Sequence, residues 1–444
     1  GFEYVTQRGV TELCGFFFGA KGNLAAEVSL VFYGVSSMFM YAAVFAETCA
    51  AALPAPFPSS AGAAGDCDYQ SSLLELPLGC RLTYWFWLAV FAILQAGLAT
   101  RNLSDQASSQ LALTALGMLS LALMLGTLAM GILIEDNECQ SQLRDEVDHV
   151  LHVCPVSLVL RLSGLSFAVS TLSSAQMAQF GTPVLTSSCG DKSGAPRVFA
   201  LALGLTCALY VAYGVLGALY FGAAGVQPLI TVLWRNYRLP WGDRAGRRAG
   251  NVIGTFIMAY PAVTVSAAFP LNAVATGNAL LWAWCDHEVI DPETGKARVV
   301  TGPRSPVRML LCLLPCCRRS LVRRCDVEGL GADVVPAGSL LLSAKRMQYT
   351  MRALVMLPAF LLAGLTSNLG TIVEVSSMAG YAFAFLVPPA LQLASRRRCE
   401  EKLGEWRTPF TLPVGSSRGM AWACLFFGLL ASAVSACGAA AGQR

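Results

Sequence analysis

The residues best suited to chemistry lie in the stretch 164–188, where hydroxyl and amide groups interrupt an otherwise apolar run. Five of them fall within about two helical turns: Ser170, Thr171, Ser173, Ser174 and Gln176. Gly181 and Pro183 follow and favour a break in a helix. Hydroxyls and freed backbone groups can replace the water around a polar solute, so the pattern predicts a solute-binding segment. The alternative is a helix face where small residues pack against a neighbouring helix.

Patterns typical of catalysis or metal binding are missing from the sequence. The chain has no GxSxG or HExxH motif, no carboxylate pair in an apolar stretch and no glycine-rich phosphate loop. His149 and His152, near Asp148 and Cys154, could assemble a metal site, but their acidic surroundings fit a solvated polar segment better. We therefore expect no enzymatic activity, no cofactor, no metal and no nucleic-acid partner.

Charged side chains are rare inside the apolar stretches. Glu47 and Glu374 lie at the ends of charge-free stretches, so we expect water at the membrane interface to hydrate both. A carboxylate at the depth of the bilayer centre, as proton relays use, is not visible in the sequence.

The hydroxyl and amide groups of 164–188 must be positioned by helices in a lipid bilayer. Hydrophobic residues make up 55% of the 444 positions and charged residues only 13%, with a mean hydropathy of +0.56, outside the range of soluble proteins. Nine stretches without Asp, Glu, Lys or Arg reach the roughly 19-residue length that spans a bilayer: 28–46, 82–100, 106–134, 162–190, 198–234, 249–285, 353–373, 375–395 and 419–443. The sequence predicts an all-α, multi-pass integral membrane protein. It favours neither the plasma membrane nor an endomembrane.

The basic residues predict which side each loop faces. With residues 1–23 in the cytoplasm, the cytoplasmic loops hold most of the 31 Lys and Arg residues, as the positive-inside rule requires. The arginine-rich segment 235–248 is an exception to this rule, because it falls on the predicted outer side. We interpret it as an interfacial helix or loop there. Two cysteine pairs share outer loops and could form disulfides there: Cys67 with Cys80, and Cys139 with Cys154.

The predicted organisation is one membrane domain with one large insertion. Its parts are a cytoplasmic segment (1–23), six spans (24–285) with outer loops 54–81, 135–160 and 224–250, a basic and mostly irregular cytoplasmic loop (286–348), and three further spans (349–443).

Six segments carry a resemblance to a known family. They are GFEYVTQRGVTELCGFFFGAKGN (1–23), VFYGVSSMFMYAAVFA (31–46), YWFWLAVFAILQAGLATRNLSDQ (84–106), AQFGTPVLTS (178–187), VSAAFPLNAVATGN (265–278) and AGYAFAFLVPPALQLASRR (379–397). The chain resembles the amino acid/auxin permease superfamily, most closely its transmembrane-protein-104-like branch. The most specific elements are FPLNAV and the pair Gln179 and Pro183, with Phe180 where that branch usually has His.

The resemblance implies the leucine-transporter fold, in which two inverted five-helix repeats and an eleventh helix hold the substrate at the repeat interface. The nine stretches would be its third to eleventh helices, and its first two helices have no counterpart before residue 24. The resemblance places 164–188 opposite the first stretch, 28–46. The sixth stretch, 249–285, can add the hydroxyls of Thr264 and Ser266 to the site. The solute-binding residues would be Tyr33, Ser36, Ser37, Phe167, Ser170, Thr171, Ser173, Ser174, Gln176, Thr264 and Ser266.

Two functional hypotheses follow. The first is a secondary transporter that moves an amino acid or a similar small solute, with sodium or a proton as the coupling ion. The second is a degenerate member of the family that does not transport and acts as a membrane scaffold or solute sensor. An intact first helix upstream would favour the first hypothesis, and a start codon just before Gly1 would favour the second.

Overall fold

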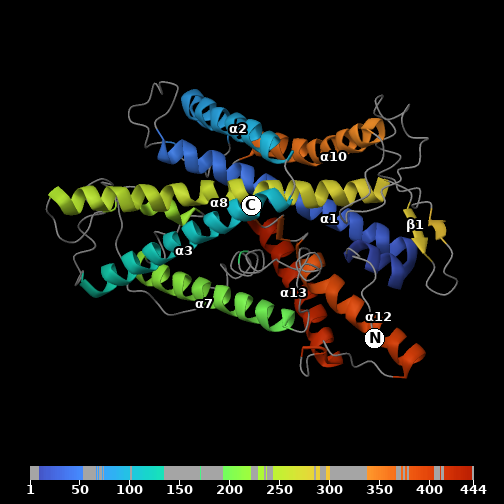
Figure 1. Cartoon of the computed structure of the whole chain (residues 1–444). Helices are drawn as coiled ribbons and strands as arrows, with labels where there is room; N and C mark the ends of the chain where they lie inside the picture. The colour runs from blue at the N-terminus through green and yellow to red at the C-terminus, as the bar shows by residue number, and fades with distance from the viewer. Residues whose placement is uncertain are drawn as a thin grey trace.

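A computed structural model describes the chain as an assembly of long helices (Figure 1). The described residues are 10–53, 67, 69, 73, 75–100, 103–134, 171, 194–221, 229–234, 237, 244–284, 287–290, 297–300, 338–366, 372–373, 376–377, 380–404, 411 and 415–442. The elements are α1 (Val10–Ala52), α2 (Leu78–Leu98), α3 (Leu103–Ile134), α7 (Ala195–Phe221), η2 (Ile230–Trp234), α8 (Arg244–Trp284), β1 (His287–Ile290), β2 (Ala297–Val300), α10 (Gly338–Leu365), η3 (Ala382–Leu386), α12 (Val387–Leu403) and α13 (Arg418–Gly442).

Seven of the described helices are long and apolar enough to cross a membrane: Lys21–Ala52, Leu78–Leu98, Leu111–Leu133, Ala195–Phe221, Gly246–Leu281, Met347–Leu365 and Arg418–Cys437. They overlap seven of the nine predicted stretches, although the helix Ala195–Phe221 ends well before the predicted stretch 198–234 does. The chain is therefore a multi-pass integral membrane protein whose spans are helical.

The two remaining stretches have different outcomes. Stretch 162–190 lies outside the described residues, apart from Thr171. In 375–395 the described part comprises residues 376–377 and 380–381 and then the π-helix η3 and α12, which continues into the charged residues after Ser395. Pro388 and Pro389 open α12. Because proline lacks an amide hydrogen, these two residues interrupt the regular hydrogen-bond ladder at the point where the helix widens.

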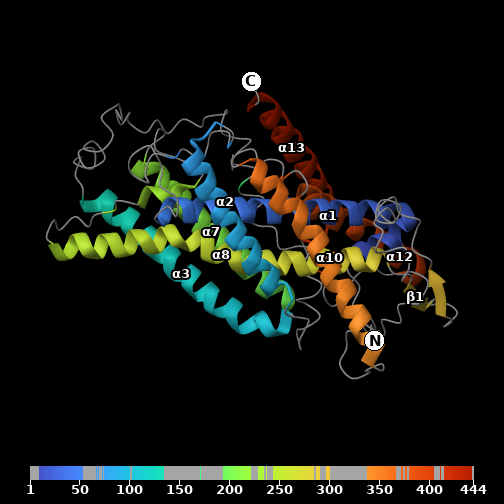
Figure 2. The same cartoon turned by 90° about the horizontal axis from the view of Figure 1, so that it is seen from above.

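The helices α1 and α8 form the long centre of the molecule and lie side by side (Figures 1 and 2). Helices α2 and α10 pack on one side of this pair, while α3 and α7 lie on the other. Helix α13 contacts α12 and η3.

An aromatic cluster holds the four helices α1, α2, α8 and α10 together. Each helix supplies one ring: Phe45, Phe91, Phe269 and Phe360 respectively. The Phe91 ring stacks on Phe45 at 4.2 Å between centroids and meets the edge of Phe269 at 5.2 Å. Phe269 and Phe360 are also 5.2 Å apart. Ring pairs at these distances add to the area that the side chains bury, so the cluster fixes the crossing point of the four helices.

A second, smaller cluster joins α3, α7 and α8 through η2. Trp234 of η2 is buried against Met124, Leu128 and Ile257, and its indole N–H donates to the Thr127 hydroxyl at 3.0 Å. This bond satisfies the polar atom of an otherwise apolar side chain, as buried tryptophans require.

Several element bounds differ from the prediction. Part of the loop predicted as irregular forms the antiparallel hairpin β1–β2, in which His287 pairs with Val300 and Ile290 with Ala297. The arginine-rich segment ends inside a helix, because α8 starts at Arg244 and carries Arg247 and Arg248 in its first turns. Likewise α10 starts at Gly338, before the predicted boundary at residue 349.

Candidate functional site

Three of the predicted solute-binding residues lie together on α1 and are buried: Tyr33, Ser36 and Ser37. The side chains of Tyr33 and Ser37 are hydrogen-bonded, which fits residues separated by about one helical turn. This part of α1 therefore presents polar groups to the protein interior instead of to lipid.

Two buried residues of α8 complete this surface, and neither belongs to the predicted set. The Asn272 side chain hydrogen-bonds with Tyr41 of α1. Thr276 lies directly against Gly34, where an added Cβ would collide with the Thr276 side chain. We call Tyr33, Ser36, Ser37, Tyr41, Asn272 and Thr276 the polar layer. The detectable sequence signal was the four-residue spacing of Asn272 and Thr276, which puts both on one helix face.

Thr264 and Ser266 do not join the polar layer through their hydroxyls. Thr264 is exposed, and its hydroxyl donates to the Tyr260 carbonyl of its own helix at 3.0 Å. The Ser266 hydroxyl donates to the Ala262 carbonyl at 2.7 Å. Both side chains thus bond within α8, as serine and threonine commonly do in helix interiors.

The backbone of Ser266 reveals another polar residue that sequence reasoning missed. In a regular helix the Ser266 carbonyl would accept the amide of residue 270, but Pro270 has no amide hydrogen. Gln95 of α2, which is fully buried, donates to this carbonyl from Nε2 at 3.3 Å. Gln95 therefore replaces the hydrogen bond that Pro270 removes, which a helix in lipid cannot obtain from water.

Most of the predicted site in the fourth stretch lies outside the described residues: Phe167, Ser170, Ser173, Ser174 and Gln176. Thr171 alone is described there, in helical conformation and exposed.

The prediction that water hydrates Glu47 is wrong. Glu47 is only 5% exposed and lies near the buried rings of Tyr69 and Tyr84. Burial, together with the Glu47 charge, raises the pKa of Tyr69 to about 12. The position of Glu47 at the end of an apolar stretch did not reveal this burial, because the neighbouring Tyr69 and Tyr84 follow later in the chain. Glu374 lies outside the described residues.

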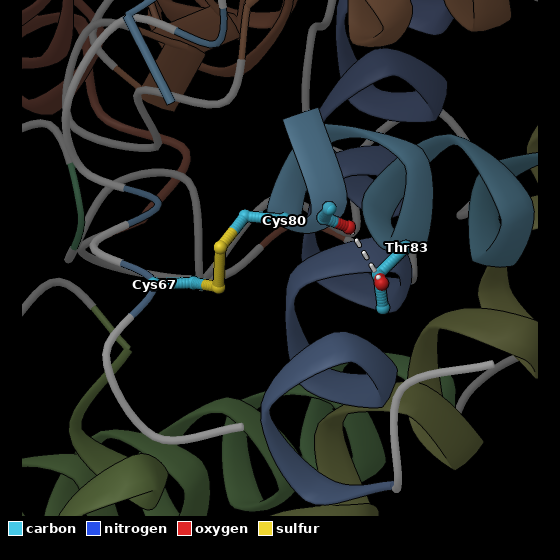
Figure 3. Close-up of a disulfide and its surroundings, with 4 residues drawn as sticks. Cys67, Cys80 and Thr83 are labelled. Atoms are coloured by element: carbon cyan, nitrogen blue, oxygen red, sulfur yellow. Dashed lines mark hydrogen bonds between the residues drawn. A yellow bond between two sulfur atoms is a disulfide. The ribbon is translucent and has the colours of Figure 1, made fainter. Parts of the chain in front are cut away.

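A disulfide ties Cys67, two residues before Tyr69, to α2. Cys67 and Cys80 are bonded, with Cα atoms 5.9 Å apart (Figure 3). The same view shows the Thr83 hydroxyl donating to the Gly79 carbonyl at 2.8 Å, in the first turns of α2. The other predicted pair, Cys139 and Cys154, lies outside the described residues.

Helices α2 and α10 satisfy each other's terminal carbonyls. Near the end of α10, Ala363 and Gly364 accept hydrogen bonds from the Tyr84 hydroxyl and the Trp85 indole, each at 3.1 Å. At the opposite end, Arg352 of α10 donates from a guanidinium nitrogen to the Ala99 carbonyl that ends α2, at 2.7 Å. A cation at a helix C-terminus also interacts favourably with the helix dipole. These contacts make α2 and α10 antiparallel neighbours.

The chemistry that this arrangement allows is hydrogen bonding. Hydroxyl and amide groups of the polar layer can accept and donate to a polar solute. A hollow of about 270 Å³ opens between α1 and α8, but its lining is apolar apart from Glu27. Within the described part of the chain, His, Cys, Asp and Glu residues nowhere gather in a group that could hold a metal ion.

No family model, curated protein or solved structure matches this chain.

Proposed function

We propose that this chain is a secondary transporter of the amino acid/auxin permease type, which moves an amino acid or a similar small solute with sodium or a proton as the coupling ion. The observation that supports this most strongly is the relation between two pairs of consecutive described spans, α1 with α2 and α8 with α10.

The two pairs relate to each other as inverted copies would. Helix α1 runs antiparallel to α8, because Tyr41 meets Asn272 while the earlier Gly34 meets the later Thr276. Helix α2 runs antiparallel to α10, and each caps the other's terminal carbonyls. Transporters built from inverted repeats have this relation and bind their substrate at the repeat interface.

The polar layer lies at this interface, between the first helix of each pair. A transporter must replace the hydrogen bonds that a polar solute loses when it leaves water, and each unmatched group costs about 1–3 kcal/mol. The polar layer supplies hydroxyls and an amide at a depth where lipid supplies none.

A solute sensor or membrane scaffold is the second candidate function. It is favoured by the internal pairing of the polar layer, in which Tyr33 bonds with Ser37 and Tyr41 with Asn272. A solute would have to exchange these bonds for its own.

Binding can be tested by the thermal stability of the purified full chain in the presence of single amino acids. A ligand at about 100 times its Kd stabilises a protein by about 2.7 kcal/mol. We expect at least one amino acid to stabilise the wild type and Thr264→Val, which alters an exposed hydroxyl bonded within α8. The same amino acid should no longer stabilise Asn272→Leu or Ser37→Ala. Equal stabilisation of all four proteins would show that the polar layer is not the site.

A further inference from the structure

Helix α1 is interrupted before it enters the membrane. Gly19 has φ 72° and ψ −167°, which divides α1 into a short segment, Val10–Phe18, and the long span that follows. Residues with a side chain rarely adopt this conformation, whereas glycine does so at little cost. An added Cβ at Gly19 would meet no atom of the described residues within 4 Å. The glycine is therefore required by the backbone angle and not by close packing, as expected at a hinge.

A basic side chain of α12, Arg398, contacts the short segment directly. The Arg398 guanidinium lies 4.2 Å from the centre of the Phe16 ring. It also donates to the Phe16 carbonyl at 3.4 Å. Phe16 lies in the last turn of the short segment, where helix carbonyls lack partners from their own helix. Arg398 thus makes a cation–π contact and a hydrogen bond to the same residue.

Helix α12, which carries Arg398, is stabilised by ion pairs of its own. The neighbouring Arg396 and Arg397 pair with Glu400 and Glu401 one turn later on α12, each at 2.9 Å. Glu400 also pairs with Arg418 at the start of α13, at 2.6 Å. The pKa of Glu400 is held below its usual value by its hydrogen bond to Arg396 and the charges of Arg396 and Arg418. Arg396 and Arg397 are therefore engaged on α12, whereas Arg398 reaches across to α1.

From these contacts we infer that Val10–Phe18 is a strap on the predicted cytoplasmic side, hinged at Gly19 and held closed on α12 by Arg398. When Arg398 releases Phe16, the strap swings away while the membrane spans stay in place. This device goes beyond the proposed transport function and does not depend on any solute.

Cys14 lies in the strap and reports its position. The side chain is 2% exposed in the closed arrangement, and burial raises the pKa of its thiol to about 11. A maleimide can react with Cys14 only after the strap opens, so the labelling rate measures the opening. Cys399, half-buried on α12, provides a reference in the same molecule.

The test is the rate at which N-ethylmaleimide labels Cys14 in the full-length protein in nanodiscs, followed by peptide mass spectrometry. Arg398→Gln should raise the rate at least about fivefold, the change expected when one cation–π contact and its hydrogen bond are lost. Gly19→Ala should also raise it, because alanine disfavours the closed hinge. Arg397→Gln is the matched control, since Arg397 is 83% exposed and pairs with Glu401 on its own helix. This variant should label at the wild-type rate.

Two further variants separate opening of the strap from general unfolding. Arg398→Lys keeps a cation over the ring and should restore most of the protection of Cys14. Phe16→Leu removes the ring but keeps the backbone carbonyl that Arg398 bonds, so it should raise the rate, though by less than Arg398→Gln does. An unchanged Cys14 rate in Arg398→Gln, or an equal increase in Arg397→Gln, would overturn the strap.

Discussion

The hydrogen bond from Gln95 to the Ser266 carbonyl should be energetically coupled to Pro270. In the wild type, Pro270 leaves this carbonyl without its helical partner, and Gln95 supplies the missing donor at 3.3 Å. Replacing Gln95 by leucine, which has a similar volume, removes the donor and leaves the carbonyl buried and unsatisfied. In a Pro270→Ala background the amide of residue 270 returns and can satisfy the carbonyl within α8, so Gln95 becomes dispensable.

The size of this coupling follows from the groups involved. Hydrogen bonds between membrane helices average about 0.6 kcal/mol and reach about 1.7 kcal/mol. The Oε1 atom of Gln95 has no hydrogen-bond partner among the described residues, so Gln95→Leu also removes a buried acceptor without a bond there, which offsets part of the loss in both backgrounds. That offset cancels in a double-mutant cycle, which isolates the coupling. We expect Gln95→Leu to destabilise the wild type by about 1 kcal/mol more than it destabilises Pro270→Ala.

The assay is reversible unfolding of the four proteins in mixed micelles with increasing dodecyl sulfate. Thr264→Val serves as a control, because its hydroxyl bonds within α8 and is unrelated to Pro270. Strict additivity of Gln95→Leu and Pro270→Ala, within about 0.3 kcal/mol, would refute the idea that Gln95 compensates for the proline.

Three further predictions follow from packing, covalent links and burial. Gly34→Ala should lower the free energy of unfolding by about 1–3 kcal/mol, because the added Cβ meets Thr276. Gly97→Ala, with open space around it among the described residues, should be neutral or raise that free energy by up to about 1 kcal/mol. Equal effects of the two substitutions in unfolding titrations would contradict the tight α1–α8 contact. Non-reducing peptide mapping should recover Cys67 and Cys80 as one joined peptide pair, and replacing both by serine should cost about 3 kcal/mol, since the bond closes a loop with a sequence separation of 13. The labelling rate of Cys14 should keep rising up to about pH 11, while an ordinary thiol levels off near its pKa of about 8.5. Because the folded state holds this proton more tightly than the unfolded state does, its contribution to stability is complete below pH 9.0 and is lost as the pH rises to about 11. A plateau of Cys14 labelling near pH 9 would show that the thiol is not buried.

The membrane spans could be predicted from the sequence because lipid imposes a simple rule. Stretches such as 28–46 and 82–100 lack charges over a bilayer's thickness, and the corresponding spans Lys21–Ala52 and Leu78–Leu98 are present in the structure. The exact helix ends were less predictable, since α8 and α10 extend beyond the apolar window into residues that tolerate either water or helix.

The polar contacts between helices could be predicted only in part. Tyr33 and Ser37 share a helix face, and that local spacing was sufficient to place them together. Asn272, Gln95 and Glu47 obtain their partners or their cover from elements distant along the chain. Such pairings depend on which helices become neighbours, and a single sequence carries no direct record of that.

The most direct measurement of transport is gradient-driven uptake by the full chain reconstituted in vesicles, with radiolabelled amino acids outside. We predict accumulation above the level of protein-free vesicles when an inward sodium or proton gradient is imposed, and loss of that accumulation when an ionophore dissipates the gradient. Thr264→Val should retain uptake, and Asn272→Leu should lose it while remaining folded. If the folded wild type accumulates no amino acid above the protein-free level under either gradient, the chain is not a secondary transporter of this class, and stabilisation by an amino acid without uptake would assign it to solute sensing.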